Sequence, residues 1–305
     1  MIVVAGEALV DLLIAPDGSV TAKLGGGPYN AARAIGRLGH PVTFLGSLSV
    51  DRFGSRLFEH LLADGVDNAA IVRCDLPTTL AAAELDDLGA ATYRFYIEGT
   101  SAPALDHVPT SLPTPTAVHA GTLGLVLEPM GTTIERYIRT LPDDVPVLLD
   151  PNCRPRVVAD RQTYLQRIEG LYGHSHIVKL STDDIEYLCP GADPLSYAHA
   201  LAASGPQAVL VTAGGEGAWA VTEGQSTMVP GRQVRVADSV GAGDSFGGAF
   251  LAWWLDHGRG VADLADHHAV VEAVDAAQEV AAFTVQQVGA EPPRRDQLSE
   301  RWQRA

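Results

Sequence analysis

The sequence predicts an α/β fold with a central, mostly parallel sheet flanked by helices. Short runs rich in Val, Ile and Leu alternate with helical patterns along most of the chain, which is typical of strand–helix–strand units. Glycine-rich or polar turns follow several of these runs, at the sheet edge where the loops of such folds bind ligands. The 305 residues contain no repeat and no long linker. We therefore expect one domain over residues 1–305.

The expected elements follow one another in a regular order. Residues 1–6 form a first buried strand, and a glycine-rich turn leads into an apolar helix over 31–38. Strand and helix pairs follow at 42–48 and 52–63, 117–121 and 127–141, 145–149 and 162–173, and 177–180 and 183–188. Beyond residue 192 the pattern is more antiparallel, with strands at 208–212, 217–222, 226–229 and 233–240, and helices at 245–255, 262–285 and 296–304.

Two segments interrupt this alternation. Residues 10–24 contain a hairpin-like piece around Pro16-Asp17-Gly18, and residues 79–100 contain two strands joined by a turn at 86–89. Neither segment fits a parallel core. We expect them to form a small β-sheet lid over the carboxyl edge of the main sheet, where it would exclude water. A surface hairpin without a function is the alternative.

Charge and composition argue against several classes of protein. The 37 acidic and 21 basic residues give a formal charge of −16, which disfavours nucleic acid or an anionic membrane surface as a partner. The apolar run 246–255 is far shorter than the roughly 20 residues that span a bilayer. The N-terminus lacks the basic segment of a signal peptide, and three widely spaced cysteines are typical of reduced thiols. We expect a cytoplasmic protein without a protein-ligated metal site.

The tetrapeptide Gly241-Ala242-Gly243-Asp244 is the strongest chemical signal. It stands between an alternating segment and an apolar helix, so it occupies a helix N-terminus. Unpaired N–H groups and the helix dipole favour an anion there. A carboxylate beside that anion suits a proton acceptor, and this pairing is what phosphoryl transfer to a hydroxyl requires. The alternative is that Asp244 caps the helix and the glycines only make a tight turn.

A second glycine-rich turn, Gly25-Gly26-Gly27-Pro28, opens another helix far upstream. Pro28 suits the first turn of a helix. Three consecutive glycines exceed what capping needs, because each costs backbone entropy on folding. They leave Asn30 free to hydrogen-bond a molecule docked against the bare backbone. The turn therefore predicts a second ligand contact.

With both turns in view, the chain resembles the ribokinase-like (PfkB) carbohydrate kinases over essentially its whole length. The signatures are Gly25-Gly26-x-x-x-Asn30 and Asp238-Ser-Val followed by the 241–244 tetrapeptide. The resemblance implies the ribokinase-like fold, with Asp244 as catalytic base and residues 241–244 as an anion hole. It assigns the sugar contacts to Asp11, Gly26, Gly27 and Asn30.

The resemblance also assigns nucleotide and ion contacts. Thr212, Gly214 and Gly217 are similar to the family's nucleotide-binding strand and turn, for which an ordinary hairpin is the alternative. Ser181 and Asp184 replace both residues of the family's Asn-x-x-Glu, which organises waters around magnesium. Further implied contacts are Lys179 for the nucleotide, Asn152 for a magnesium-bound water, Arg154 for a phosphate, and Asp238 for a monovalent cation.

These assignments imply an ATP-dependent sugar kinase that uses Mg²⁺, with K⁺ as a candidate activator. The leading substrate is fructose, phosphorylated on a primary hydroxyl to fructose 6-phosphate. One alternative is 2-keto-3-deoxygluconate, whose carboxylate would find Arg94 near the lid, and another is a different sugar or nucleoside. Other classes are a non-catalytic nucleotide- or sugar-binding protein and a Rossmann dehydrogenase, although Phe246 stands where that fingerprint needs glycine. The sequence leaves the choice among hexoses open. A homodimer through the lid is a further expectation.

Overall fold

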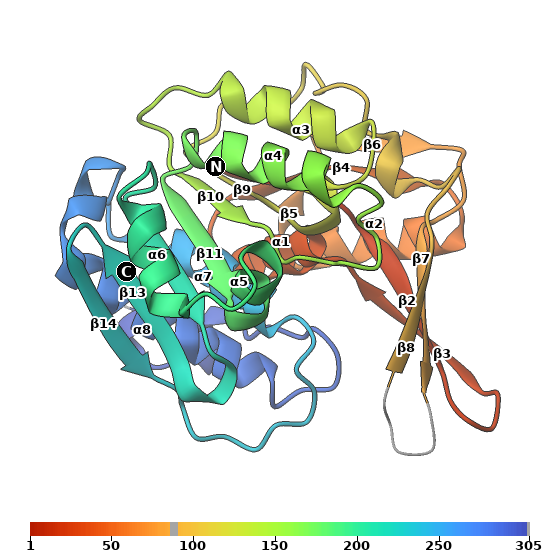
Figure 1. The fold of residues 1–305 in the computed structure, drawn as a ribbon. Helices are drawn as coiled ribbons and strands as arrows, with labels where there is room; N and C mark the ends of the chain where they lie inside the picture. Colours follow the sequence, from red (N-terminus) through yellow and green to blue (C-terminus); the bar gives the residue numbers. More distant parts are fainter. Residues whose placement is uncertain (86–90, 304–305) are drawn as a thin grey trace.

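The computed structural model describes residues 1–85 and 91–303, which form two separate sheets with helices packed on the larger one (Figure 1). Within these residues the larger sheet has ten strands in the order β14-β13-β12-β11-β10-β9-β1-β4-β5, with β6 beside β4. Pairing is parallel from β5 to β12, and β13 and β14 continue the sheet antiparallel, so the predicted mostly parallel sheet is confirmed. The strands are β1 (Ile2–Ala5), β4 (Val42–Ser49), β5 (Val66–Asp67), β6 (Ile71–Cys74), β9 (Ala117–Gly121), β10 (Val147–Asp150), β11 (Ile177–Ser181), β12 (Ala208–Thr212), β13 (Gly217–Thr222) and β14 (Gln225–Pro230).

Helices cover both faces of this sheet. Alternate residues of β1 face opposite layers: Ile2 and Val4 pack against the layer of α1, α7 and α8, and Val3 and Ala5 pack against that of α3, α4 and α6. Among the described residues, none of the helices combines the length and apolar character needed to cross a membrane. The helices are α1 (Gly27–Arg37), α2 (Arg52–Ala63), α3 (Met130–Arg139), α4 (Arg161–Tyr172), α5 (Thr182–Leu188), α6 (Pro194–Ala202), α7 (Ala242–Asp256), α8 (His267–Thr284) and α9 (Glu300–Gln303).

A small four-stranded sheet stands apart from the main one, at the lower right of Figure 1. Its order is β3-β2-β7-β8, from β2 (Leu9–Ile14), β3 (Val20–Gly25), β7 (Leu80–Leu85) and β8 (Ala91–Tyr96). Both segments predicted to leave the core therefore enter one sheet, joined by parallel pairing of β2 with β7. The turn predicted at 86–89 lies outside the described residues.

The prediction of a strand over 233–240 is wrong. Residues 231–240 run as an irregular segment between β14 and α7. Alternation there does not produce a buried face, since Val236 is 62% exposed. The amides of Ala237 and Asp238 both donate to the carbonyl of Val285, which ties the segment to the end of α8 instead of to a strand.

Candidate active site

Asp244 lies buried in the first turn of α7, where the carboxyl ends of the central strands meet two helix N-termini. The amide nitrogen Nδ2 of Asn30 donates to Asp244 Oδ2 at 2.9 Å, and Asn152 Nδ2 donates to Oδ1 at 3.3 Å. In the described part of the chain no side chain caps α7, whose N-cap is Gly241. Asp244 is therefore not a capping acid, and the fold brings three predicted site residues together.

The surroundings of Asp244 make it a stronger proton acceptor than an exposed aspartate. Burial raises its pKa, while the Asn30 amide and the charges of Lys179 and Arg154 pull the pKa down. The net direction is upward. A carboxylate that must take a proton from an alcohol benefits from this higher affinity, provided that nearby cations keep it ionised at neutral pH.

The two glycine turns allow close approach around this carboxylate. A Cβ on Gly27 would collide with Thr122 Oγ1 and stand 3.3 Å from Asp244 Oδ1. A Cβ on Gly243 would stand 2.9 Å from Lys179 Nζ. Gly241 has a φ of 79°, a left-handed conformation that glycine adopts without strain. The start of α7 therefore presents bare backbone amides beside the carboxylate, as an anion cradle requires.

Lys179 is engaged beneath this cradle. Its Nζ lies 3.0 and 3.2 Å from the two carboxylate oxygens of Asp150, and both side chains are buried. Burial opposes the Lys179 charge, but the carboxylates of Asp150, Asp184 and Asp244 raise its pKa overall. Burial raises the pKa of Asp150 to about 7, with Lys179 acting against the rise. The ammonium is therefore a fixed positive charge under the cradle, and its nucleotide contact stays a prediction.

Ser181 and Asp184 form a capping box at the start of α5. Asp184 Oδ2 accepts hydrogen bonds from the amide and hydroxyl of Ser181, each at 2.7 Å, and Asp184 N donates to Ser181 Oγ at 3.1 Å. Asp184 Oδ1 accepts the amide of Cys153 at 2.6 Å. The pair thus braces the exit of β10 against α5. Its role towards magnesium-bound water stays a prediction.

The predicted nucleotide residues lie together between β12 and β13. Thr212 ends β12, and its hydroxyl donates to Leu180 O at 3.4 Å. Gly214 opens a short 3-10 turn with free space around its Cα. Gly217 begins β13, where a Cβ would collide with the carbonyl of Val229. Packing therefore accounts for Gly217, and a left-handed φ of 54° accounts for Gly214.

Asp11 and Arg154 face the site from the small sheet and from the loop after β10. Burial raises the pKa of Asp11 to about 6, Arg154 lowers it and Asp244 raises it. The three charges therefore act on one another across the gap between the small sheet and the core. Arg154 donates to the carbonyls of Asn152 and Cys153 at 3.2 and 3.1 Å, and its side chain is exposed. A guanidinium at the mouth of the site suits a phosphate.

Asp238 links two loops behind the anion cradle. Its Oδ1 accepts the amide of Val240 at 3.0 Å, and its Oδ2 accepts the amide of Gly289 at 2.9 Å. The carboxylate therefore holds the segment before α7 against the segment after α8. Its predicted contact with a monovalent cation stays a prediction.

Sequence reasoning missed two residues that shape the site. Glu7 is buried, and its carboxylate accepts the amides of Gly27 and Gly124, each at 2.9 Å. Burial, with the charge of Asp244 adding to its effect, raises the pKa of Glu7 to about 8 against those hydrogen bonds. Thr122 has a φ of 55° and accepts Asn152 Nδ2 at 3.2 Å. Glu7 could have been noticed because it is an acidic residue directly after the apolar first strand. The sequence carries no such signal for Thr122.

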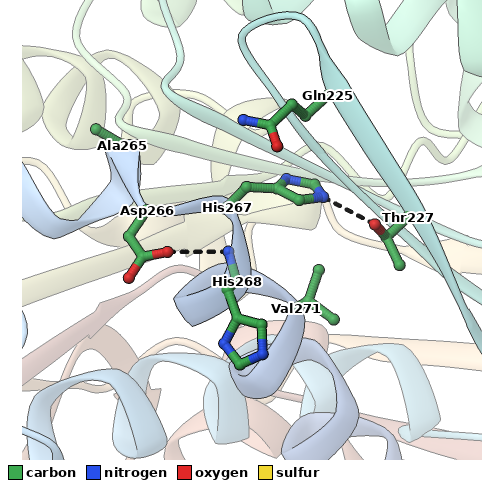
Figure 2. Close-up of a pocket in the computed structure, with 7 residues that line it drawn as sticks. All are labelled: Gln225, Thr227, Ala265, Asp266, His267, His268 and Val271. Atoms are coloured by element: carbon green, nitrogen blue, oxygen red, sulfur yellow. Dashed lines mark hydrogen bonds between the residues drawn. The ribbon is translucent and has the colours of Figure 1, made fainter.

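A separate pocket of about 540 Å³ lies at the outer edge of the main sheet (Figure 2). His267 stands beside it, with its ring nitrogens 2.8 and 2.9 Å from the hydroxyls of Thr222 and Thr227. The pocket adjoins the start of α8, and α8 runs from there back towards the site. Its seven drawn lining residues, all in the described part of the chain, include none of the predicted site residues.

Comparisons with known proteins agree with this geometry. The family model of the pfkB family carbohydrate kinases matches residues 1–297. The fructokinase of Rhizobium leguminosarum bv. trifolii is 34% identical over 260 residues, which is 83% of this chain and 79% of that protein. The fructokinase of Vibrio alginolyticus is 29% identical over 294 residues, covering 94% and 93%.

The fold has solved relatives as well. A fructokinase from Xylella fastidiosa, solved with bound ATP, superposes with a TM-score of 0.86 at 28% identity and covers 95% of this chain and 93% of that one. The ribokinase-like fold is thereby confirmed, and the Rossmann dehydrogenase alternative is wrong. The glycine turns, the buried carboxylate and the family match lead to one conclusion: this chain belongs to the pfkB family of carbohydrate kinases.

Proposed function

We propose that this protein is an ATP-dependent fructokinase that forms fructose 6-phosphate and ADP. The observation that carries the proposal is the buried carboxylate of Asp244 beside the bare amides at the start of α7, held by Asn30 and Asn152. The similarity of the whole chain to fructokinases from several organisms supports fructose as the acceptor.

In the proposed reaction Asp244 accepts the proton of the primary hydroxyl. The hydroxyl oxygen attacks the γ-phosphorus in line, and the bond from that phosphorus to the β–γ bridging oxygen breaks, which releases ADP. Amides of residues 241–244 stabilise the charge on the transferring group. The charge of Lys179 beneath Gly243 adds to this positive field.

The sugar contacts proposed are Asp11, Gly26, Gly27 and Asn30. Asn30 supports this assignment, because within the described structure its buried Oδ1 has no hydrogen-bond partner. A buried acceptor left unpaired is costly unless a ligand satisfies it. A sugar hydroxyl would donate to it while the other end of the same amide holds Asp244.

The ATP contacts proposed are Thr212 and the turn that begins at Gly214, with Arg154 on a phosphate. The residues fit Mg²⁺ bound through phosphates and water, because the oxygen-bearing side chains of Asn152 and Asp184 stand near Asp244 and Cys153 at the exit of β10. Asn152 and Asp184 would hold the metal-bound waters. When bound, the ion neutralises charge on the β- and γ-phosphate oxygens.

Fructose affinity should fall in acid, because the proposed role of Asp11 is to accept hydrogen bonds from the sugar as a carboxylate. Its pKa is raised to about 6, so protonation removes the acceptor below that pH. Below pH 6 the association constant of fructose should then decrease with each pH unit, and the decrease should approach about tenfold per unit. Calorimetric titration between pH 5 and 8 measures this slope. Asp11→Asn should bind weakly with a shallower slope, and an equally steep slope in that variant would discard the assignment.

We propose a monovalent cation near Asp238, as the family resemblance implies. The carboxylate joins Val240 and Gly289, so its loss would loosen the loops that such an ion would bridge. Turnover should be higher in potassium chloride than in tetramethylammonium chloride at equal ionic strength. Asp238→Ala should reduce this difference. Equal turnover of the wild-type protein in both salts would argue against the cation.

The small sheet is proposed to act as a lid, and a homodimer through it stays a prediction. Val20, Tyr93 and Tyr96 are exposed on this sheet. Arg94, the cation considered for a 2-keto-3-deoxygluconate carboxylate, instead pairs with Glu84 at 3.1 Å on the same sheet.

A panel of sugars with coupled ADP detection tests the function. The panel should contain fructose, glucose, ribose, a nucleoside and 2-keto-3-deoxygluconate. We expect ADP release to be fastest with fructose. Faster release with 2-keto-3-deoxygluconate would replace the substrate, and nucleotide binding without ADP release for any sugar would make the protein a non-catalytic binder.

A further inference from the structure

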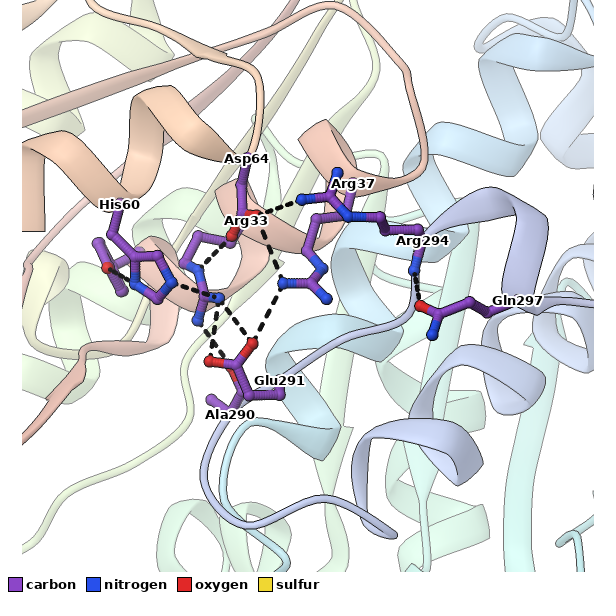
Figure 3. Close-up of polar contacts among 9 residues, drawn as sticks. Arg33, Arg37, His60, Asp64, Ala290, Glu291, Arg294 and Gln297 are labelled. Carbon is purple, nitrogen blue, oxygen red and sulfur yellow. Dashed lines mark hydrogen bonds and ion pairs between the residues drawn. The ribbon is translucent and has the colours of Figure 1, made fainter.

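A charged network lies behind the candidate active site, between α1, α2 and the segment after α8. Figure 3 shows it around Arg33, whose side chain is only 1% exposed. Arg33 Nε donates to Asp64 Oδ2 at 2.7 Å, and Arg33 Nη2 donates to both Glu291 oxygens at 3.1 and 3.2 Å. We call this set, with Arg37 and His60, the Arg33 network. The helical pattern over 31–38, interpreted as apolar, gave no sign of it.

The third contact of Arg33 reaches the main chain. Its Nη1 donates to the carbonyl of Ala290 at 2.8 Å, and both groups are buried. Arg33 Nη2 also lies 3.1 Å from His60 Nε2. Because a guanidinium only donates, Nε2 accepts, and a neutral ring carries its proton on Nδ1, which faces Tyr29 Oη at 3.0 Å. Every branch of the guanidinium is therefore occupied.

Ala290 connects this guanidinium to the anion cradle. The methyl group of Ala290 lies so close to Gly241 that a Cβ on the glycine would collide with it. Gly289, one residue earlier, donates its amide to Asp238. The segment 289–291 is thus held by Asp238 on one side and by Arg33 on the other, and it rests on the residue that starts α7.

Helix α1 contacts both sides of the cradle through neighbouring positions. Asn30 donates to Asp244, and Arg33, three residues later on the same helix face, donates to Ala290. A buried ion pair by itself adds little to stability compared with apolar packing of the same volume. The placement of the charge therefore calls for a reason beyond stability, and the contact with Ala290 supplies one.

We infer that Arg33 is a positioning residue for phosphoryl transfer, which fixes segment 289–291 and through it the orientation of the amides at Gly241–Asp244 relative to Asn30. Loss of the contact would let the first turn of α7 shift against the bound sugar. A displacement of about 1 Å can cost about 10²-fold in rate. The inference rests on the proposed kinase function and names a residue that acts through the backbone.

Arg33→Lys tests the inference, because a lysine ammonium ends near the position of the arginine Cζ, one bond short of the Nη1 atom that donates to Ala290. It keeps a charge next to Asp64 but does not reach the carbonyl of Ala290. We expect kcat to fall by about 10- to 100-fold, with KM for sugar and ATP within about threefold of wild type. A merely structural role would instead lower the melting temperature and leave kcat per folded molecule unchanged.

Arg37→Lys is the matched control. Arg37 lies one turn further along α1 and donates to the same two acids, Glu291 at 3.1 Å and Asp64 at 3.4 Å. Its substitution should leave kcat within about threefold of wild type. Ala290→Gly breaks the chain of contacts at its other end without touching a buried charge, and it should lower kcat in the same direction. It decides the question if Arg33→Lys does not fold.

The outcomes separate the inference from the proposed function. All rates are taken as ratios to wild type with the sugar that wild type phosphorylates best. Folded Arg33→Lys with wild-type kcat, or an unchanged kcat in Ala290→Gly, would overturn the positioning role. A raised KM with normal kcat would also overturn it. Failure of the wild type to release ADP with any sugar would instead overturn the kinase proposal.

Discussion

Asp244→Asn should lower kcat by about 10²- to 10⁴-fold, the range that a positioned base contributes. The amide retains the shape of the side chain and a partner for Asn30, but it cannot take the hydroxyl proton. Because Asp244 does not cap α7, the substitution removes no cap from the helix. Steady-state ADP release measures kcat, and calorimetry should show ATP binding close to that of wild type.

Asp193→Asn provides a control for the change of charge. Asp193 caps α6 through Ser196 N at 2.8 Å and lies outside the site. Its substitution removes the same charge at a helix start and should leave turnover unchanged. Near-normal turnover in Asp244→Asn, with any sugar, would show that Asp244 is not the proton acceptor.

Among the variants proposed for this protein, Lys179→Met should produce the largest decrease in the free energy of unfolding. The substitution leaves the buried Asp150 carboxylate without its ammonium partner, and breaking a buried pair in this way costs about 3–5 kcal/mol. The loss should be greater at pH 8 than at pH 5. The folded-state pKa of Asp150 is already raised to about 7, so the folded protein favours its protonated form and protonation in acid removes the unpaired charge. Urea unfolding followed by circular dichroism measures both values.

The double variant Asp150→Asn/Lys179→Met separates charge from packing. With both charges removed, nothing ionised is left unpaired at this site, and most of the lost stability should return. Equal instability of the single and double variants would show that the contacts of the lysine stem, and not its charge, stabilise the fold. Activity should stay low in both, because the positive field beneath the cradle is absent.

The sequence predicted the parts of the site that depend on local pattern. Bare backbone at Gly27 and Gly243 follows from glycine-rich turns at helix starts, and both helices begin within a few residues of those turns. The meeting of Asn30 with Asp244 across 214 residues was implied by the family resemblance, which assigns both glycine-rich helix starts to one site.

Contacts made by long side chains could not be predicted from local sequence pattern. The pairing of Lys179 with Asp150 requires two neighbouring strands to place both residues on the same face at the same level. The bond from Arg33 to Ala290 spans 257 residues and joins a helix to an irregular segment. The strand expected at 233–240 failed for a related reason, since its hydrogen bonds go to the end of α8. Periodicity carries no information about such partners.

The connection between the small sheet and α1 has a mechanical consequence. Strand β3 ends at Gly25 and α1 begins at Gly27, so Gly26 alone joins them, with a φ of 115°. The chain entering β2 runs alongside, where a Cβ on Gly26 would stand 2.7 Å from Glu7 O. Under the lid proposal, movement of the β2–β3 hairpin would twist the backbone at Gly26, which is itself one of the proposed sugar contacts. A hexose bound against Gly26 would therefore restrict the backbone at this joint and fix the orientation of the β2–β3 hairpin relative to α1.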